Sequence, residues 1–166
     1  IIDIGTGGGF PLLPLALLLP QHRFTGLDSV GKKIDAIHRI ADGMGMTNVS
    51  FLNQRIDDCG RDPQHREQSD VVTARALAPL NVLIEYAAPL IKTGGHLIAW
   101  KSMQIQDELQ ESLLARAELS CHLDTKHEYT LPADFGTRQL LVFKKTFKTD
   151  QKYPRETGVP KKHPLL

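Results

Sequence analysis

The stretch Asp3-Ile4-Gly5-Thr6-Gly7-Gly8-Gly9 decides the fold, because four glycines in five positions follow a short apolar run and precede a helix-like segment. Glycine lets the backbone turn tightly and lets a ligand approach where a Cβ would otherwise stand. The spacing is G-x-G-x-G, which differs from the G-x-G-x-x-G of dinucleotide-binding loops. Asp3 comes two residues before the first glycine, and its carboxylate suits a cationic or amino-bearing ligand better than a pyrophosphate. The stretch predicts a strand–loop–helix turn that binds a small ligand.

Outward from this loop, apolar segments of strand length alternate with segments of helical periodicity. Strands are expected at residues 1–4, 23–27, 49–52, 70–73 and 96–100, and helices at 12–19, 32–44, from 79 onward and at 107–117, with a polar loop at 58–69. The last two strands, 119–129 and 138–145, follow each other without a helix and are expected to pair antiparallel. The pattern predicts an α/β fold with helices on both faces of a mostly parallel seven-stranded sheet and an antiparallel C-terminal strand.

The charge of the chain is balanced overall but unevenly distributed. Lys and Arg number 20 and Asp and Glu number 19 among 166 residues, which excludes a histone-like basic binder and an acidic disordered chain. Eight Lys or Arg residues lie in 138–166, against Asp150 and Glu156. We therefore expect a domain over 1–147, followed by a basic extended tail over 148–166 whose partner is a polyanion.

Other composition features exclude several classes of protein. Cys59 and Cys121 form no CxxC pair and the seven histidines form no ligand grouping, so we expect reduced thiols and no metal site. The longest apolar run, Phe10–Pro20, is too short to span a bilayer, and we expect a cytoplasmic protein with no membrane partner. Since the chain starts at Ile1 rather than Met, we also expect a natural N-terminal segment to precede it.

Two further acidic residues follow expected strands. Asp28 comes 19 positions after Gly9, where an acidic residue accepts hydrogen bonds from ribose hydroxyls. Ile56-Asp57 follows the third strand and is expected beside a base, where Asp57 either accepts from an adenine amino group or caps a turn. This combination fits S-adenosylmethionine, whose sulfonium cation is stabilised by a nearby carboxylate.

With these residues the chain resembles the RsmG (GidB) family, class I S-adenosylmethionine-dependent methyltransferases of Rossmann-like fold that modify a guanine N7 in small-subunit (16S) ribosomal RNA. The matching blocks are residues 3–11, 27–29 with 32–33, 55–57, 73–76, 94–95 with 100–101, and 153–160. The Thr-Ala-Arg-Ala block and the Tyr-Pro-Arg-x-x-Gly-x-Pro tail are the most particular to the family. Leu12 and Ser102 depart from it, because family members usually have glycine there, and the helical segment that normally precedes the loop is absent.

The resemblance, together with the residue patterns above, implies a site and a mechanism. The expected cofactor-binding residues are Asp3, Gly5, Gly7, Phe10, Asp28, Ile56, Asp57 and Arg75. The expected substrate-positioning residues are Arg55, Arg75 and Lys101. Guanine N7 carries a free lone pair, so no general base is required and positioning supplies the rate. The implied partner is 16S ribosomal RNA or the small ribosomal subunit, bound by a monomer.

Three alternatives stay open at this point. A methyltransferase for another RNA or a small molecule shares the glycine loop but not the tail block. A nicotinamide-dependent oxidoreductase is disfavoured by the glycine spacing and by Asp3. A non-catalytic RNA-binding domain is disfavoured by the intact loop with Asp28.

Overall fold

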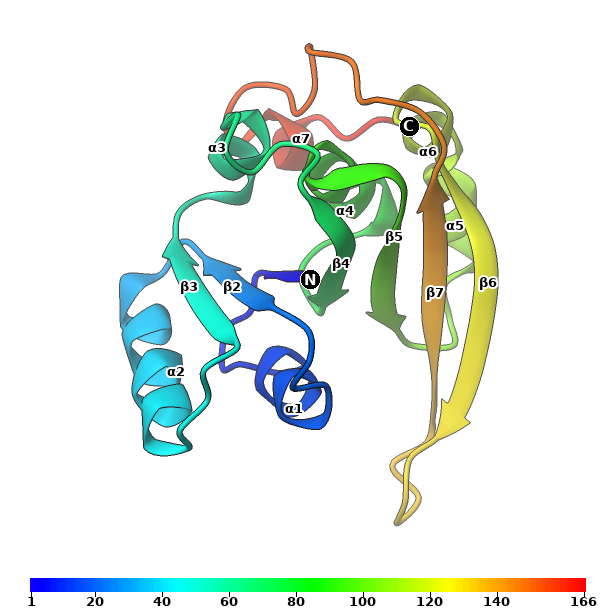
Figure 1. The fold of residues 1–166 in the computed structure, drawn as a ribbon. Coiled ribbons are helices and arrows are strands. Elements are labelled where there is room, and N and C mark those ends of the chain that lie inside the picture. Colours follow the sequence, from blue (N-terminus) through cyan, green and yellow to red (C-terminus); the bar gives the residue numbers. More distant parts are fainter.

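The computed structural model describes residues 1–166, and its centre is a seven-stranded sheet of order β3-β2-β1-β4-β5-β7-β6 (Figure 1). The strands are β1 (Ile2–Ile4), β2 (Phe24–Asp28), β3 (Val49–Asn53), β4 (Ser69–Arg75), β5 (Ile91–Lys101), β6 (Cys121–Thr130) and β7 (Thr137–Lys145). Pairing is parallel from β3 through β5, and β7 is antiparallel to both of its neighbours. The predicted sheet, with its antiparallel C-terminal strand, is confirmed.

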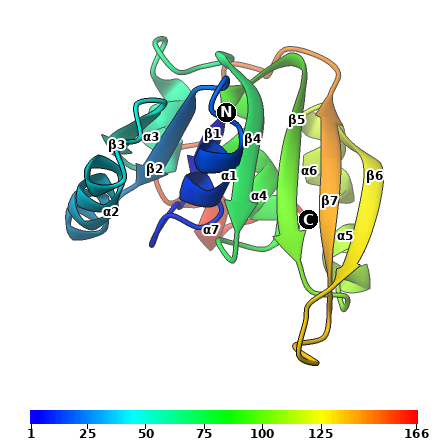
Figure 2. The same cartoon turned by 60° about the horizontal axis from the view of Figure 1, so that its bottom comes forward.

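Helices cover both faces of this sheet (Figure 2). They are α1 (Leu12–Leu18), α2 (Gly31–Gly43), α3 (Ile56–Arg61), α4 (Leu80–Ala87), the 3-10 turn η1 (Ala88–Leu90), α5 (Gln106–Glu111), α6 (Leu113–Glu118) and α7 (Val159–Lys162). One apolar cluster joins α1 and α2 to β2, and a larger one joins α4 and α6 to the central strands. Because crossovers between parallel strands are right-handed, the helices change face where the strand order reverses after β3. None of the helices has the length and apolar character that a membrane crossing requires.

Three local predictions were wrong. The expected loop 58–69 begins instead inside α3, which buries Cys59 and Gly60 against the core. The helix expected at 107–117 is divided at Ser112, whose side chain donates a hydrogen bond of 2.9 Å to the Leu109 carbonyl. Strand β5 starts at Ile91, five residues earlier than expected, because the glycines at 94–95 lie inside the strand instead of separating it from the preceding helix.

The segment after β7 folds back across the molecule instead of extending into solvent (Figure 1). It returns to α3 and α4, buries Tyr153 and Pro154, and forms α7. Arg66 holds it there by donating to the backbone carbonyls of Thr149, Asp150 and Tyr153 at 2.7–3.0 Å. No hydrophobic periodicity marks this segment, since polar contacts to backbone atoms secure much of it.

Candidate active site

Two clefts open where the parallel strands end, and residues Ala76–Ala78 line both of them. Strand order reverses between β1 and β4, and ligands of open α/β sheets bind beside that reversal at the carboxyl ends of the strands. The first cleft, of about 350 Å³, is lined by Gly5, Asp28, Ser29, Val30, Lys33, Arg55, Ile56, Asp57, Tyr86 and Lys161 as well. The second, of about 640 Å³, is lined mainly by residues of β4, β5 and the β6–β7 pair.

The glycine loop is anchored to the end of β2. The backbone N–H groups of Gly5 and Thr6 both donate to the Leu27 carbonyl, at 2.8 and 3.0 Å. Asp28 accepts from the N–H of Gly7 at 3.0 Å and from the N–H of Val30 at 2.9 Å, and its side chain is almost fully buried. Each of its oxygens has a further lone pair to offer. Asp28 therefore ties the loop to the start of α2 and presents a carboxylate to the first cleft.

Asp3 is a buried carboxylate with one oxygen left without a partner. Thr73 donates to its Oδ1 at 2.7 Å. Oδ2 is buried and forms no well-aligned hydrogen bond, and the buried Thr6 hydroxyl, which is close enough to lower the pKa of Asp3, also has no partner. Burial raises the pKa of Asp3, while the Thr73 hydrogen bond and the nearby charge of Arg75 act in the opposite direction. A buried unpaired acceptor is unfavourable, so a cationic or N–H-bearing ligand that reaches Asp3 is favoured. The chain therefore fits a ligand such as S-adenosylmethionine at this position.

Asp57 is held by two partners. Arg55 donates through Nε and Nη2 to its two oxygens, at 3.1 and 3.0 Å, and the N–H of Gly158 donates to Oδ2 at 2.7 Å. Burial pushes the pKa of Asp57 upward, but the hydrogen bonds from Arg55 and Gly158 outweigh it and the pKa lies below its usual value. Arg55, which was expected to contact RNA, is thus paired with Asp57 through its guanidinium, while its side chain is half exposed.

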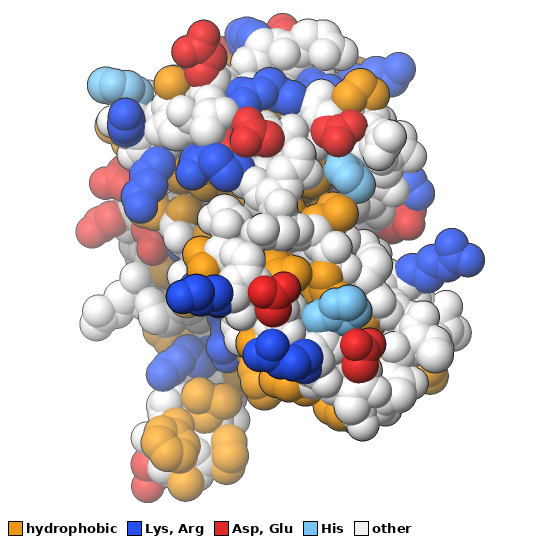
Figure 3. All heavy atoms as spheres, turned by 90° about the vertical axis from the view of Figure 1, so that its left-hand side faces the viewer, with side chains coloured by type: hydrophobic (Ala, Val, Ile, Leu, Met, Phe, Trp, Pro, Cys, Tyr) orange, Lys and Arg blue, Asp and Glu red, His pale blue; other side chains and the backbone are white.

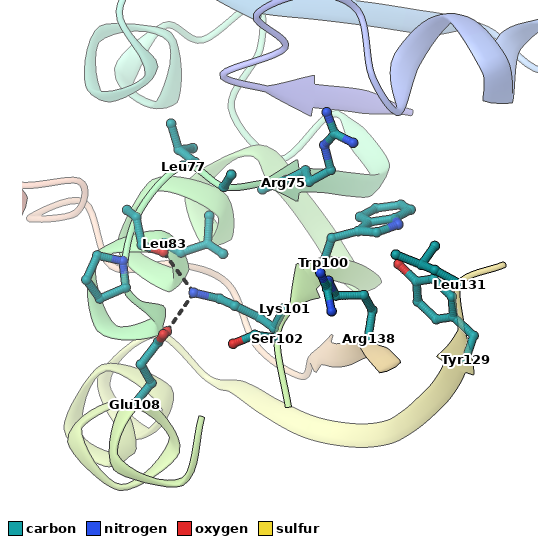
Figure 4. A pocket seen from close by; sticks show the side chains of 14 residues that line it. Arg75, Leu77, Leu83, Trp100, Lys101, Ser102, Glu108, Tyr129, Leu131 and Arg138 are labelled. Atoms are coloured by element: carbon teal, nitrogen blue, oxygen red, sulfur yellow. Dashed lines mark hydrogen bonds and ion pairs between the residues drawn. The ribbon is translucent and has the colours of Figure 1, made fainter. Parts of the chain in front are cut away.

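The second cleft has one basic wall and one aromatic wall (Figure 4). On one side the Lys101 ammonium donates to Glu108 at 2.6 Å and to the Ala78 carbonyl at 3.0 Å. On the other side Trp100 faces Tyr129, with Arg138 beside them. Tyr129 and Arg138 are opposed across β6 and β7, which explains why they reach the cleft together.

Arg75 also lines the second cleft and forms no ion pair. Its guanidinium is 5.9 Å from the centre of the exposed Phe10 ring, a cation–π distance. In Figure 4 it points away from the Lys101–Glu108 pair. Arg75 is therefore an unpaired cation on the wall of the second cleft, close enough to Asp3 to affect its pKa.

The residues predicted from the sequence fall into three places. Gly5, Asp28, Arg55, Ile56 and Asp57 line the first cleft, and Arg75 and Lys101 line the second. Asp3 is buried on β1, and Gly7 and Phe10 lie on the glycine loop. Arg138 and Glu108 were missed. Pairing of the last two strands is a signal for Arg138, and no signal in the sequence indicates Glu108.

The β6–β7 hairpin projects past the carboxyl edge of the sheet beside the second cleft (Figure 1). Its tip is apolar and Phe135 is 70% exposed. Figure 3 shows hydrophobic side chains on this projection, while basic and acidic side chains are interspersed over the rest of that side. No group of three His, Cys, Asp or Glu side chains is placed to hold a metal ion.

Solved structures similar to this chain are methyltransferases. An antibiotic-resistance methyltransferase, Kmr, is 20% identical with a TM-score of 0.65, covering 86% of this chain and 85% of that one. A 16S rRNA (adenine-N1)-methyltransferase from Catenulisporales acidiphilia, solved with its cosubstrate SAM, is 14% identical with a TM-score of 0.68, covering 90% and 85%. At these identities the likeness concerns the fold, and it confirms the predicted class I methyltransferase fold.

Sequence comparison is more specific. The model of a family described as GidB, rRNA small subunit methyltransferase G, matches residues 1–139. A ribosomal RNA small subunit methyltransferase G from Alkaliphilus metalliredigens is 41% identical, covering 99% of this chain and 69% of the relative. One from Staphylococcus aureus is 42% identical, covering 100% and 69%. The chain belongs to the rRNA small subunit methyltransferase G (GidB) family.

Proposed function

We propose that this chain transfers the methyl group of S-adenosylmethionine to the N7 atom of a guanine in small-subunit (16S) ribosomal RNA. The observation that carries the proposal is the pair of clefts that meet at Ala76–Ala78. The first combines the carboxylates of Asp28 and Asp57 with basic side chains and suits the cofactor. The second has the aromatic and basic side chains that bind a base and its phosphates. Family membership supports the same reaction.

Three carboxylates in or beside the first cleft match three parts of the cofactor: Asp28 and Asp57 line the cleft, and Asp3 is buried on β1 just before the glycine loop. Asp28 has free lone pairs for the ribose hydroxyls, and Ile56 with Asp57 flanks the adenine. The unpaired oxygen of Asp3 accepts from the amino group, and Arg75 holds the carboxylate. When bound, S-adenosylmethionine supplies an electrophilic methyl group on a sulfonium.

In the second cleft, the side chains position the base rather than activate it. Trp100 and Tyr129 offer aromatic faces for stacking on an unpaired guanine. Arg138 supplies positive charge for phosphate or for the guanine O6. The Lys101 ammonium is paired with Glu108 and bonded to the Ala78 carbonyl, which leaves its third proton to donate to the substrate. An attack by the free lone pair of N7 needs no proton removed. The rate then comes from holding N7 in line with the methyl group.

The test uses small-subunit ribosomal RNA transcribed either with GTP or with 7-deaza-GTP, so that the second transcript lacks every guanine N7. We expect transfer of radiolabelled methyl from S-adenosylmethionine to the first transcript and none to the second. Equal labelling of both would contradict N7 as the acceptor. Labelling of neither, in subunits as well as in naked RNA, would contradict the proposed substrate.

A matched pair of variants tests the second cleft. We expect Trp100→Ala to raise the KM for RNA about tenfold, because base–aromatic stacking contributes about 1–3 kcal/mol, and Trp100→Phe to retain most of the affinity. The dissociation constant for S-adenosylhomocysteine should stay the same in both variants. Wild-type KM for RNA in Trp100→Ala would remove Trp100 from the substrate site.

A further inference from the structure

The C-terminal segment Tyr153–Lys162, called the strap below, is fixed to the body of the protein by a buried ion pair. Glu85 on α4 is fully buried, and Arg155 donates to its two oxygens through Nε and Nη2 at 2.9 and 2.7 Å. The Arg155 backbone N–H adds a third bond, 3.0 Å to Oε1. A buried carboxylate needs this complete set of partners, so the strap has one position relative to α4.

From this clamp the strap reaches the first turn of α3. Thr157 donates to Asp58 at 2.8 Å and accepts from Arg61 at 2.6 Å. The next residue, Gly158, donates its N–H to Asp57 at 2.7 Å with a φ of +84°, a conformation that favours glycine. The strap thus supplies one of the hydrogen bonds that orient Asp57 in the first cleft.

The strap also forms part of the cleft itself, because Lys161 of α7 is among the residues that line it. The basic residues of this segment are therefore not equivalent. Arg155 is neutralised by Glu85 and Lys152 pairs with Glu118, whereas Lys161 and Lys162 form no ion pair.

We infer that the strap is a wall of the cofactor cleft and sets its affinity, with Glu85 and Arg155 as positioning residues that act through Gly158 and Asp57. This inference rests on the proposed function for the identity of the ligand. The segment that was predicted to bind RNA then has a second role. It binds the nucleoside of the cofactor from the side opposite the glycine loop. The cofactor site is then closed by residues from both ends of the chain.

Calorimetric titration with S-adenosylhomocysteine tests the strap directly. We expect Arg155→Ala to raise the dissociation constant about tenfold, equivalent to about 1.4 kcal/mol, and Arg155→Lys to raise it less, because lysine keeps the charge without the fork. Thr157 lies on the exposed side of the strap, so Thr157→Val should raise the dissociation constant about threefold and leave the fold intact. Lys152→Ala is the matched control, since Lys152 is an exposed cation directly before the strap and does not line the cleft.

Kinetics separate this role from a general loss of structure. The KM for S-adenosylmethionine should rise in the Arg155 and Thr157 variants, with kcat at saturation and the KM for RNA unchanged. If Arg155→Ala does not fold, Thr157→Val and Arg155→Lys decide alone. Wild-type affinity for S-adenosylhomocysteine in both folded variants would contradict the role of the strap in cofactor binding, and would leave the proposed function unaffected. A wild-type chain that binds no S-adenosylhomocysteine would instead contradict the proposed function.

Discussion

Substituting Gly5 with alanine is expected to damage the glycine loop through two separable effects. Gly5 has a φ of +67°, and a Cβ built on it would lie 2.5 Å from Cδ1 of Leu77. A residue with a Cβ in this left-handed region costs about 1–2 kcal/mol. The clash forces Leu77 to move, and because the atom in contact is the far end of a flexible, partly buried side chain, we expect this to add about 1 kcal/mol, the low end for overpacking.

The neighbouring glycines are matched controls for these two effects. Gly7 also has a positive φ, of +54°, but a Cβ there meets only the Gly5 carbonyl at an ordinary 3.7 Å. Gly8 has neither a positive φ nor any atom within 4 Å of a built Cβ. Since alanine restricts the unfolded chain by about 0.4–1 kcal/mol, we expect net losses of about 2 kcal/mol for Gly5→Ala and about 1 kcal/mol for Gly7→Ala. Gly8→Ala should be neutral or slightly stabilising.

Urea denaturation of the three variants, with S-adenosylhomocysteine titrations alongside, measures both consequences. Gly5→Ala should weaken binding about tenfold, because Leu77, which lines both clefts, must move. Adding Leu77→Ala to Gly5→Ala removes the clash but not the φ strain, so the double-mutant cycle should return about 1 kcal/mol of favourable coupling. Equal stability of all three single variants, or no coupling to Leu77, would refute this account of the loop.

Three other outcomes are expected. Burial raises the pKa of both Cys59 and Cys121 to about 12, so neither should react with a thiol reagent in the native protein near pH 8.5, about where a free thiol ionises; rapid native labelling would contradict their burial. The pKa of Asp57 is lower in the folded than in the unfolded chain, so its stabilising contribution is present above the unfolded pKa, about 3.9, and is lost as pH falls through the folded pKa. Asp57→Asn should therefore reduce the fall of the unfolding free energy at acid pH. The same pH dependence in variant and wild type would contradict this contribution of Asp57. Arg75→Ala should leave the unfolding free energy within about 0.5 kcal/mol, since Arg75 has no ion pair, yet slow methyl transfer about tenfold; a fully active variant would remove Arg75 from the site.

Most of the fold could be predicted because its signals are local. The glycine loop and the strand–helix alternation define the parallel sheet, and the absence of a helix between the last strands defines the antiparallel pair. Asp3 and Asp28 could be named as site residues for the same reason, since each occupies a fixed place relative to a strand end. Resemblance to a family, rather than residue patterns alone, supplied Arg75 and the N7 chemistry.

What escaped prediction depends on contacts between distant parts of the chain. Glu85 reads as one polar residue in an apolar helix until Arg155, 70 positions later, is placed against it. Glu108 reaches the second cleft only because α5 packs beside the end of β5, where it meets Lys101. The strap has no periodicity to detect, since backbone carbonyls and carboxylates secure much of it. From the charge count alone, Arg155 of the strap was therefore expected to bind RNA, whereas it is paired with a buried carboxylate.

Lys145 is the clearest example of a residue whose surroundings come from distant parts of the chain. Alternation along β7 places it on the buried face with Leu141 and Phe143. Its side chain is fully buried, and its ammonium donates to Glu67 at 2.6 Å and to the carbonyls of Ala88 and Ile91 at 2.8 and 2.7 Å, so all three protons are used. Lys145→Met keeps the length but leaves Glu67 without its cation and the Ile91 carbonyl without this donor. Removing one partner of a buried pair costs about 3–5 kcal/mol, and because Glu67 is partly exposed we expect about 3 kcal/mol in urea denaturation. A loss below about 1 kcal/mol would mean that an apolar residue serves equally well there, as in those proteins where buried ion pairs are dispensable.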